Sequence, residues 1–273
     1  MTAADAGSWQ EAEEEQRGPV GKAFRLSAAD SLSLGNALCG FLSVCVLATA
    51  VIQSLSSGGK LEVQPRFFAT AVVLLLIGAT CDLFDGLVAR RFRASAMGAE
   101  LDNLADVISF GFAPAFMIVI WGSARPDKVA LWAVLLTAGA VLLAGVVRLA
   151  RFACVKTKSG DFMGLPIPMG AMTVISLVML FTTPSYLVLA ALLGVAWLMV
   201  SRIEYPKPKG QLLAVVLGWI LVNVAFLTFW VAFPEGGDLP IKVGGAMQIA
   251  LVAVIPLRML FYKREKKREN VGV

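Results

Sequence analysis

Long apolar stretches, separated by short polar turns, follow one another along most of the chain. A membrane-spanning helix needs about 20 predominantly apolar residues, and eight stretches come close to or exceed that length. They lie at about residues 33–55, 67–90, 98–121, 128–152, 164–182, 184–201, 211–233 and 242–262. The turn between the fifth and sixth stretches is very short. An alternative interpretation therefore shortens one of these two spans or merges it with its neighbour. The pattern therefore predicts an all-α polytopic transmembrane bundle of about eight spans.

Composition agrees with a membrane protein. Hydrophobic residues make up 58% of the sequence and the mean hydropathy is +0.77, well above the values of soluble domains. Residues 1–26 are polar and include the acidic run EAEEEQ, so we expect a surface tail and no cleavable signal peptide. Histidine is absent, which excludes histidine bases and histidine metal ligands. The four cysteines form no CxxC pair and are expected to be small core residues rather than disulfides or zinc ligands.

Basic residues are distributed unevenly between the two sides of the predicted bundle. The side that holds both chain ends carries clusters such as Arg90-Arg91 and Lys266-Lys267-Arg268. The other side carries only Lys60, Arg66, Arg125, Lys128 and Lys242. Because cytoplasmic loops are enriched in Lys and Arg, we expect both termini in the cytoplasm. The net charge of +5 thus reflects topology, and no nucleic-acid partner is expected because no basic domain stands apart from the spans.

Four aspartates, Asp82, Asp85, Asp102 and Asp106, interrupt the apolar sequence of the second and third spans. A carboxylate inside a span is costly and is by default a functional residue. Helical spacing places each pair on one face, and antiparallel helices joined at residues 90–93 bring all four to one depth, about 12 Å from the turn. Clustered carboxylates need cations, and oxygen ligands favour Mg²⁺ or Mn²⁺. Two such ions suit phosphoryl transfer.

Small and basic residues accompany these aspartates. Gly86 and Ala89 add no bulk to the aspartate face, so a ligand can approach the backbone there. Arg90 offers a planar fork for phosphate oxygens. Gly98 is expected to permit close approach of the second helix. Together these residues predict room for a phosphate-bearing ligand beside the metals.

Three further polar residues lie near the expected cytoplasmic side. Asn36 is expected to hydrogen-bond either a nucleotide or an aspartate, or to bridge two helices. Arg148 and Arg151 share a helix face at i and i+3, where they either bind an anion at the mouth of the site or extend to lipid phosphates. Residues 107–114 contain Gly and Pro and predict a kink, with Ser109 and Gly111 in packing roles.

The aspartate spacing, D-x2-D-G-x2-A-R-x7-G-x3-D-x3-D, resembles the signature of the CDP-alcohol phosphotransferases, and every fixed position is matched. LADVISFGFAPA, RLARF, GLPIPMGA and VSRIEYPKPK resemble the phosphatidylserine synthase branch of bacteria and archaea. Ala153 stands where that branch usually has Asn, which leaves the role of that Asn open here. The resemblance covers residues 31–207; residues 1–30 form a cytoplasmic tail with a short amphipathic stretch, and 208–273 add two spans and a basic tail.

The resemblance implies a six-helix catalytic core in the bilayer of a prokaryotic cytoplasmic membrane, with the active site facing the cytoplasm. It implies transfer of a phosphatidyl group from CDP-diacylglycerol to L-serine, releasing CMP, and a homodimer. Asp82, Asp85 and Asp102 are the implied ligands of two divalent cations, Mg²⁺ or Mn²⁺. Asp106 is the implied general base or shared ligand. Gly86, Ala89 and Arg90 are implied to receive the nucleotide diphosphate.

Two rival functions remain. The same chemistry could use glycerol 3-phosphate or inositol phosphate as acceptor, and the donor could carry ether chains. A cation or proton transporter also uses intramembrane carboxylates. Transporters usually show internal repeats and sites near the middle of the membrane. No repeat is visible here and the carboxylates lie near one face, so the transferase is favoured.

Overall fold

The computed structural model describes residues 27–56, 61–91, 97–125, 127, 129–154, 162–179 and 183–205, and the isolated positions 218, 221, 222, 225, 228 and 229. Apart from one pair of two-residue strands, the regular structure in these ranges is helical. The helices are α2 (Ala28–Ser56), α3 (Pro65–Arg91), α4 (Gly98–Asp106), the π-helical turn η1 (Val107–Phe112), α5 (Ala113–Ser123), α6 (Leu131–Cys154), α7 (Ile167–Val178) and α8 (Ser185–Val200). α4, η1 and α5 run on as one continuous helix. The predicted all-α architecture is confirmed.

Four of these helices are long and apolar enough to cross a membrane. They are α2, α3, the continuous α4–η1–α5 helix and α6, close to the first four predicted spans. α7 and α8 match the fifth and sixth predictions in position but have only 12 and 16 residues in helical conformation. The predicted spans at 211–233 and 242–262 and the basic tail lie outside the continuously described residues. The polytopic membrane bundle is therefore supported, whereas the number of spans stays a prediction.

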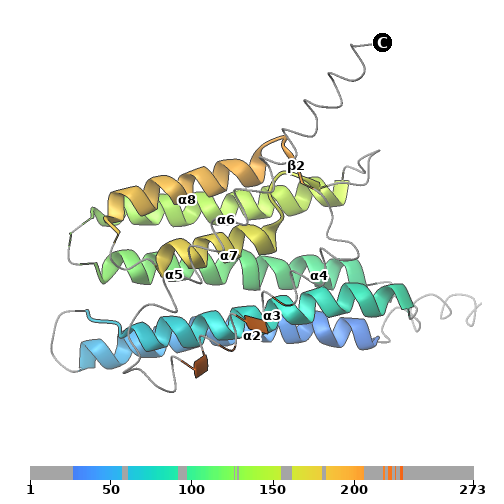
Figure 1. The fold of residues 1–273 in the computed structure, drawn as a ribbon, viewed down its shortest axis with the longest axis horizontal. Helices are drawn as coiled ribbons and strands as arrows, with labels where there is room; N and C mark the ends of the chain where they lie inside the picture. Colours follow the sequence, from blue (N-terminus) through green and yellow to red (C-terminus); the bar gives the residue numbers. More distant parts are fainter. Residues whose placement is uncertain are drawn as a thin grey trace, which may run out of the picture.

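The helices form three layers (Figure 1). α2 and α3 lie side by side in one outer layer, α6 and α8 form the other, and α4, α5 and α7 lie between them. Large side chains such as Trp121, Phe110 and Met117 fill the core between the layers. The outer faces expose Phe41, Trp132 and other large apolar side chains, as expected for surfaces in contact with lipid rather than water.

A short strand pair ties the start of α7 to the end of α8. β1 (Phe162–Met163) runs antiparallel to β2 (Glu204–Tyr205). The Gly164 N–H, directly after β1, donates to the Ile203 carbonyl at 2.8 Å. Gly164 has φ of +80°, and a side chain there would meet the Met199 carbonyl, so only glycine fits this turn. The turn delays the start of α7 to Ile167, which is one reason why this helix is shorter than its apolar stretch.

At the opposite end of the bundle, a polar cluster joins the α5–α6 loop to the start of α8. Asp127 accepts hydrogen bonds from the Ser185 N–H at 2.9 Å and from the Ser185 hydroxyl at 2.8 Å. Arg125 donates to the Ser185 hydroxyl and to the Thr183 carbonyl, and lies 3.4 Å from the Asp127 carboxylate. Asp127 thus caps the first turn of α8 from another loop, where a carboxylate stabilises the helix dipole.

Candidate active site

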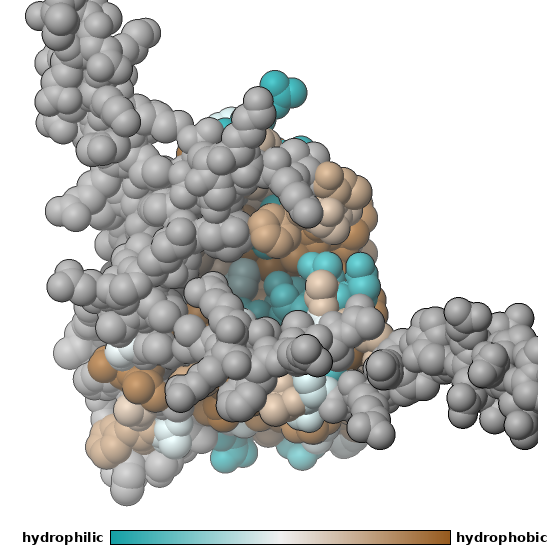
Figure 2. Space-filling view, turned by 90° about the vertical axis from the view of Figure 1, so that its right-hand side faces the viewer, coloured by the Kyte–Doolittle hydropathy of each residue, from teal (hydrophilic) through white to brown (hydrophobic). Residues whose placement is uncertain are grey.

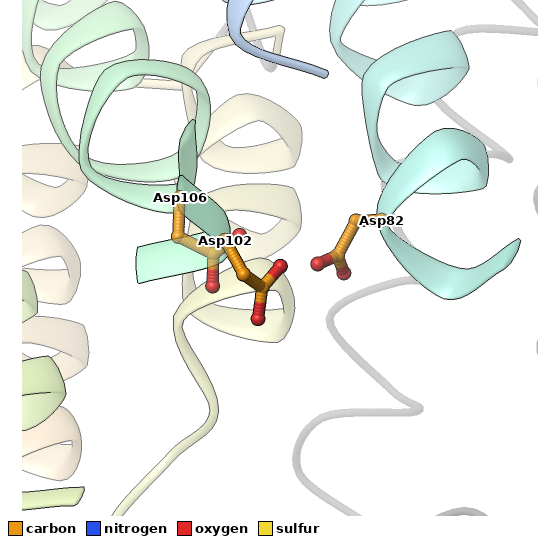
Figure 3. Close-up of side chains that lie close together, drawn as sticks. All are labelled: Asp82, Asp102 and Asp106. Carbon is orange, nitrogen blue, oxygen red and sulfur yellow. The ribbon is translucent and has the colours of Figure 1, made fainter. Parts of the chain in front are cut away.

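Two antiparallel helices bring three carboxylates together at one end of the bundle. Asp82 comes from α3, and Asp102 and Asp106 come from successive turns of α4. One oxygen of each lies within 4.8 Å of an oxygen of the others. Figure 3 shows the three side chains pointing toward one another across the space between the helices. The helical spacing predicted this meeting, because Asp102 and Asp106 are four residues apart on one face.

Asp85 lies beside this group, on the side of α2. It is buried, and the Ser33 hydroxyl of α2 donates to its Oδ2 at 2.8 Å. Asp85 also interacts electrostatically with Asp102. All four predicted aspartates are therefore neighbours, with Asp85 held by a hydrogen bond from α2.

The cluster has the donor set of a divalent-cation site. Oδ1 of Asp102 and Oδ1 of Asp106 are buried and have no hydrogen-bond partner among the described residues. Buried like charges at such distances repel strongly unless opposite charge is bound between them. Carboxylate oxygens without nitrogen or sulfur ligands suit Mg²⁺ or Mn²⁺. The residues present therefore fit the predicted hard divalent cations.

Arg148 is a basic neighbour of the cluster in the described residues. It lies on α6, is only 5% exposed, and interacts electrostatically with Asp106 and Asp82. Its guanidinium carbon lies 5.6 Å from the centre of the Phe152 ring. One guanidinium cannot balance four carboxylates, so Arg148 leaves room for further cations or for a ligand that carries both charges.

Arg151, one turn further along α6, has different surroundings. Its Nη1 donates to the carbonyl of Val200, the last residue of α8, at 2.8 Å. This contact satisfies a carbonyl that the end of a helix leaves unpaired. The two arginines thus have different partners in the structure, and Arg148 is the one that interacts with the aspartates.

Among the predicted nucleotide residues, Gly86 lies in the turn of α3 after Asp85, and a side chain there would meet no atom within 4 Å. The open space agrees with room for a ligand. Gly98 is the first residue of α4. Ala89 and Arg90 belong to the last turns of α3, and their side chains lie outside the described part of the structure.

Asn36 is completely buried between three helices. Its Oδ1 would lie 2.8 Å from a side chain built on Gly78 of α3, and its carbonyl accepts a hydrogen bond from Ser109 of η1. Neither polar atom of its side chain has a partner among the described residues. The structure therefore places Asn36 between helices, and which of the predicted partners its side-chain amide binds stays a prediction.

Sequence reasoning also missed the contact between Ser33 and Asp85. The signal was present, because Asp30, Ser33, Asn36 and Ser43 are the buried polar residues of α2. The first three recur every three residues along an otherwise apolar helix and so lie near one face. A polar stripe of this kind indicates that α2 faces other polar groups.

Hydrophilic side chains gather at the end of the bundle that holds the aspartates. Figure 2 views the molecule from the side on which α3 ends and α4 begins, and hydrophilic side chains gather there in a hollow between hydrophobic ones. A polar recess at the end of an apolar bundle allows charged groups to enter from water while apolar chains stay in lipid.

Comparison with known proteins agrees with this geometry. The family model for CDP-alcohol phosphatidyltransferase matches residues 26–203, which include every helix from α2 to α8. The chain is 34% identical over 192 residues to the archaetidylserine synthase of Methanothermobacter thermautotrophicus, covering 68% of this chain and 72% of the relative. It is 31% identical over 183 residues to the CDP-diacylglycerol–serine O-phosphatidyltransferase of Bacillus subtilis, covering 65% and 89%. The protein of that name from Mycobacterium leprae is 33% identical over 207 residues, covering 70% and 63%.

Proposed function

The chain belongs to the CDP-alcohol phosphatidyltransferase family, and we propose that it transfers the phosphatidyl group of CDP-diacylglycerol to L-serine, producing phosphatidylserine and CMP. The names of its curated relatives support serine as the acceptor, because those described above are called archaetidylserine or phosphatidylserine-forming enzymes. The observation that carries the chemistry is the convergence of Asp82, Asp102 and Asp106. One relative is called an archaetidylserine synthase, and archaetidyl lipids carry ether-linked chains. A donor with ether-linked chains is therefore also tested.

In the proposed site, Asp82, Asp85 and Asp102 would hold two divalent cations, Mg²⁺ or Mn²⁺. Such ions, when bound, neutralise pyrophosphate oxygens and the charge that develops on the CMP leaving group. Ser33 keeps the Asp85 carboxylate directed into the site through its hydrogen bond. The open side of Gly86 supports placing the nucleotide diphosphate against α3, with Ala89 and Arg90 further along the same helix and Gly98 opposite.

Asp106 is proposed as the general base. The serine hydroxyl oxygen attacks the β-phosphorus of CDP-diacylglycerol, a new P–O bond forms, and the bond to the CMP oxygen breaks. Asp106 accepts the hydroxyl proton, which requires that the serine oxygen come within hydrogen-bond reach. The buried and unpartnered Oδ1 of Asp106 supports this role, since it has capacity to accept a proton.

Arg148 is proposed to bind the carboxylate of the serine acceptor. A guanidinium matches a carboxylate with two parallel hydrogen bonds, and burial strengthens that pairing. Its position beside Asp106 supports this, because the acceptor hydroxyl must reach the base while its carboxylate is held. Arg151 is proposed to bind lipid phosphate or to stabilise the packing of α6 against α8. Asn36 is proposed to form part of the inner wall of the site.

Acceptor and donor are tested in one assay. Purified protein is incubated with CDP-diacylglycerol and Mn²⁺, and CMP release is measured with L-serine, glycerol 3-phosphate or inositol phosphate. Of the three acceptors, we expect only L-serine to give CMP release. The donor with ether-linked chains is assayed in parallel. Release with a phosphorylated acceptor but not with serine would overturn the acceptor and keep the family.

The proposed location is a prokaryotic cytoplasmic membrane, with the aspartates on the cytoplasmic side. The uneven distribution of basic residues supports this orientation. Cysteines introduced at 91–97 or 203–209 should react with impermeant reagents only from the cytoplasm, and cysteines near Gly59 or Gly236 only from outside. The opposite labelling pattern would invert the topology. A homodimer, implied by the resemblance, is tested by the mass of the purified protein in detergent.

A further inference from the structure

α2 touches both of the helices that carry the aspartates. It packs against α3 on one side and against α4 and η1 on the other. Near its start, Ser33 holds Asp85 of α3. Two turns later, Gly40 meets η1, and positions seven residues apart lie on the same face of a helix. α2 therefore contacts both of the helices from which the carboxylate cluster is built.

The contact at Gly40 is made against backbone. A side-chain carbon on Gly40 would lie 2.5 Å from the Ser109 hydroxyl and 2.7 Å from the Ser109 Cα. A rotation of the serine side chain would relieve the first contact but not the second. Ordinary carbon contacts are about 3.5–4.0 Å, so a methyl group would push the two helices apart by about 1 Å.

A hydrogen bond fixes the same contact. The Ser109 hydroxyl donates to the Asn36 carbonyl at 2.7 Å, and Ser109 is fully buried. Side-chain to backbone bonds across helices hold their relative height as well as their distance. Gly40 and Ser109 thus set both the spacing and the register of α2 against η1.

η1 transmits this position to the carboxylates. It begins at Val107, directly after Asp106, and its π-helical character is visible in the bond from the Ala113 N–H to the Ile108 carbonyl. Single π turns are frequent at functional sites because they reorient side chains within a helix. Ser109 follows Asp106 by three residues of unbroken helix, so a shift of Ser109 moves Asp106 and, one turn earlier, Asp102.

We propose that Gly40 and Ser109 are positioning residues that set the distance between the α3 carboxylates and the α4 carboxylates. The inference rests on the divalent-cation site of the proposed function. Neither residue touches the reacting atoms. They act through the α2–η1 contact, which keeps Asp102 and Asp106 within reach of Asp82. Metal sites tolerate displacements of only about 0.2 Å from the preferred ligand distances, so a shift of about 1 Å is decisive.

Gly40→Ala tests this proposal, and Gly35→Ala is the matched control on the same helix. A side chain on Gly35 would only touch the Cys81 sulfur at 3.8 Å, an ordinary contact. Binding of Mn²⁺ to the purified full-length protein is measured by the electron paramagnetic resonance signal of the free ion. We expect Gly40→Ala to lose about 10-fold to 100-fold in Mn²⁺ affinity, the range typical for loss of an outer-shell support. Gly35→Ala should bind as the wild type does.

Each outcome has a defined meaning. Equal Mn²⁺ affinity of Gly40→Ala and Gly35→Ala, with both folded by circular dichroism, overturns the positioning role and leaves the proposed function standing. No Mn²⁺ binding by the wild type overturns the metal site itself and this inference with it. If Gly40→Ala does not fold, Ser109→Ala takes its place, because it removes the hydrogen bond without adding an atom. A loss of at least about threefold in affinity supports the proposal, and no loss overturns it.

Discussion

The two arginines at the end of α6 allow a sharp test of how the acceptor is held. Arg148 is buried beside Asp106 and Asp82, whereas Arg151 donates to the carbonyl of Val200. They have the same chemistry, lie on the same helix and are three residues apart. Lysine substitution at each position therefore gives a variant and its matched control.

The expected effect follows from what lysine keeps and what it loses. Arg148→Lys keeps a positive charge near the aspartates, so the electrostatic balance of the cluster changes little. It removes the planar fork that can grip a carboxylate with two hydrogen bonds. Loss of one charge-assisted hydrogen bond costs about 2 kcal/mol, which corresponds to about 30-fold in affinity. We therefore expect the KM for serine to rise about 30-fold in Arg148→Lys.

The assay is CMP release, with serine varied at saturating CDP-diacylglycerol and then the reverse. In Arg148→Lys the KM for CDP-diacylglycerol should stay within about threefold of the wild type, since less than about 0.7 kcal/mol of donor binding is removed. Arg151→Lys should raise the serine KM by no more than that same factor. An unchanged serine KM in Arg148→Lys would refute the carboxylate role. A selective rise in the donor KM would instead assign Arg148 to the phosphates of CDP-diacylglycerol.

Three further outcomes are expected. EDTA should abolish CMP release and Mg²⁺ or Mn²⁺ should restore it, whereas full activity in metal-free buffer would contradict the ligand assignment. Asp82→Asn and Asp102→Asn should each lower kcat about 100-fold or more while the protein still inserts, because each removes a charged ligand; retention of most activity would show that the residue is not a ligand. Asp127→Asn should lower the free energy of unfolding by about 0.5 kcal/mol, because asparagine can still cap α8 but no longer supplies the negative charge that interacts with the helix dipole and with Arg125. Desolvation alone would raise the pKa of Asp127, but the two hydrogen bonds from Ser185 and the Arg125 charge outweigh it and hold the pKa below its ordinary value. The wild type's advantage should therefore be complete above about pH 4 and disappear as the pH falls through the lower pKa of the folded state, as followed by thermal unfolding at several pH values; an advantage independent of pH would refute this.

The sequence was sufficient to predict the four long helices and the aspartate cluster of the described residues, because both depend on local periodicity. Apolar stretches of membrane length located four long helices within a few residues. The spacing of Asp102 and Asp106 at i and i+4 is a property of any helix. The matched distances from the basic turn were enough to bring Asp82 to the same depth.

The parts that could not be predicted depend on contacts between distant segments. The sequence predicted a kink in residues 107–114, and the irregularity takes the form of η1, which lies before Pro114. The segment VISFGF is apolar throughout, so no periodic signal distinguishes a π turn from an α turn. Likewise, the partner of Arg151 depends on where α8 ends, 49 residues away from Arg151.

The aspartates at the two ends of the bundle differ in how completely they are hydrogen-bonded. This difference indicates a ligand site at one end, independently of any relative. At one end, both oxygens of Asp127 accept hydrogen bonds from Ser185, and Arg125 lies beside them. At the other end, Asp102 and Asp106 each keep a buried oxygen without a partner in the described residues. A buried polar atom left unpaired costs about 1–3 kcal/mol. The protein forms hydrogen bonds to both carboxylate oxygens of Asp127 at one end of the bundle. The buried oxygens without a partner at the other end are therefore best explained by a ligand that supplies the missing positive charge. The same reasoning explains why α2 contacts both aspartate helices: carboxylates that repel one another stay close only if the surrounding helices hold them there.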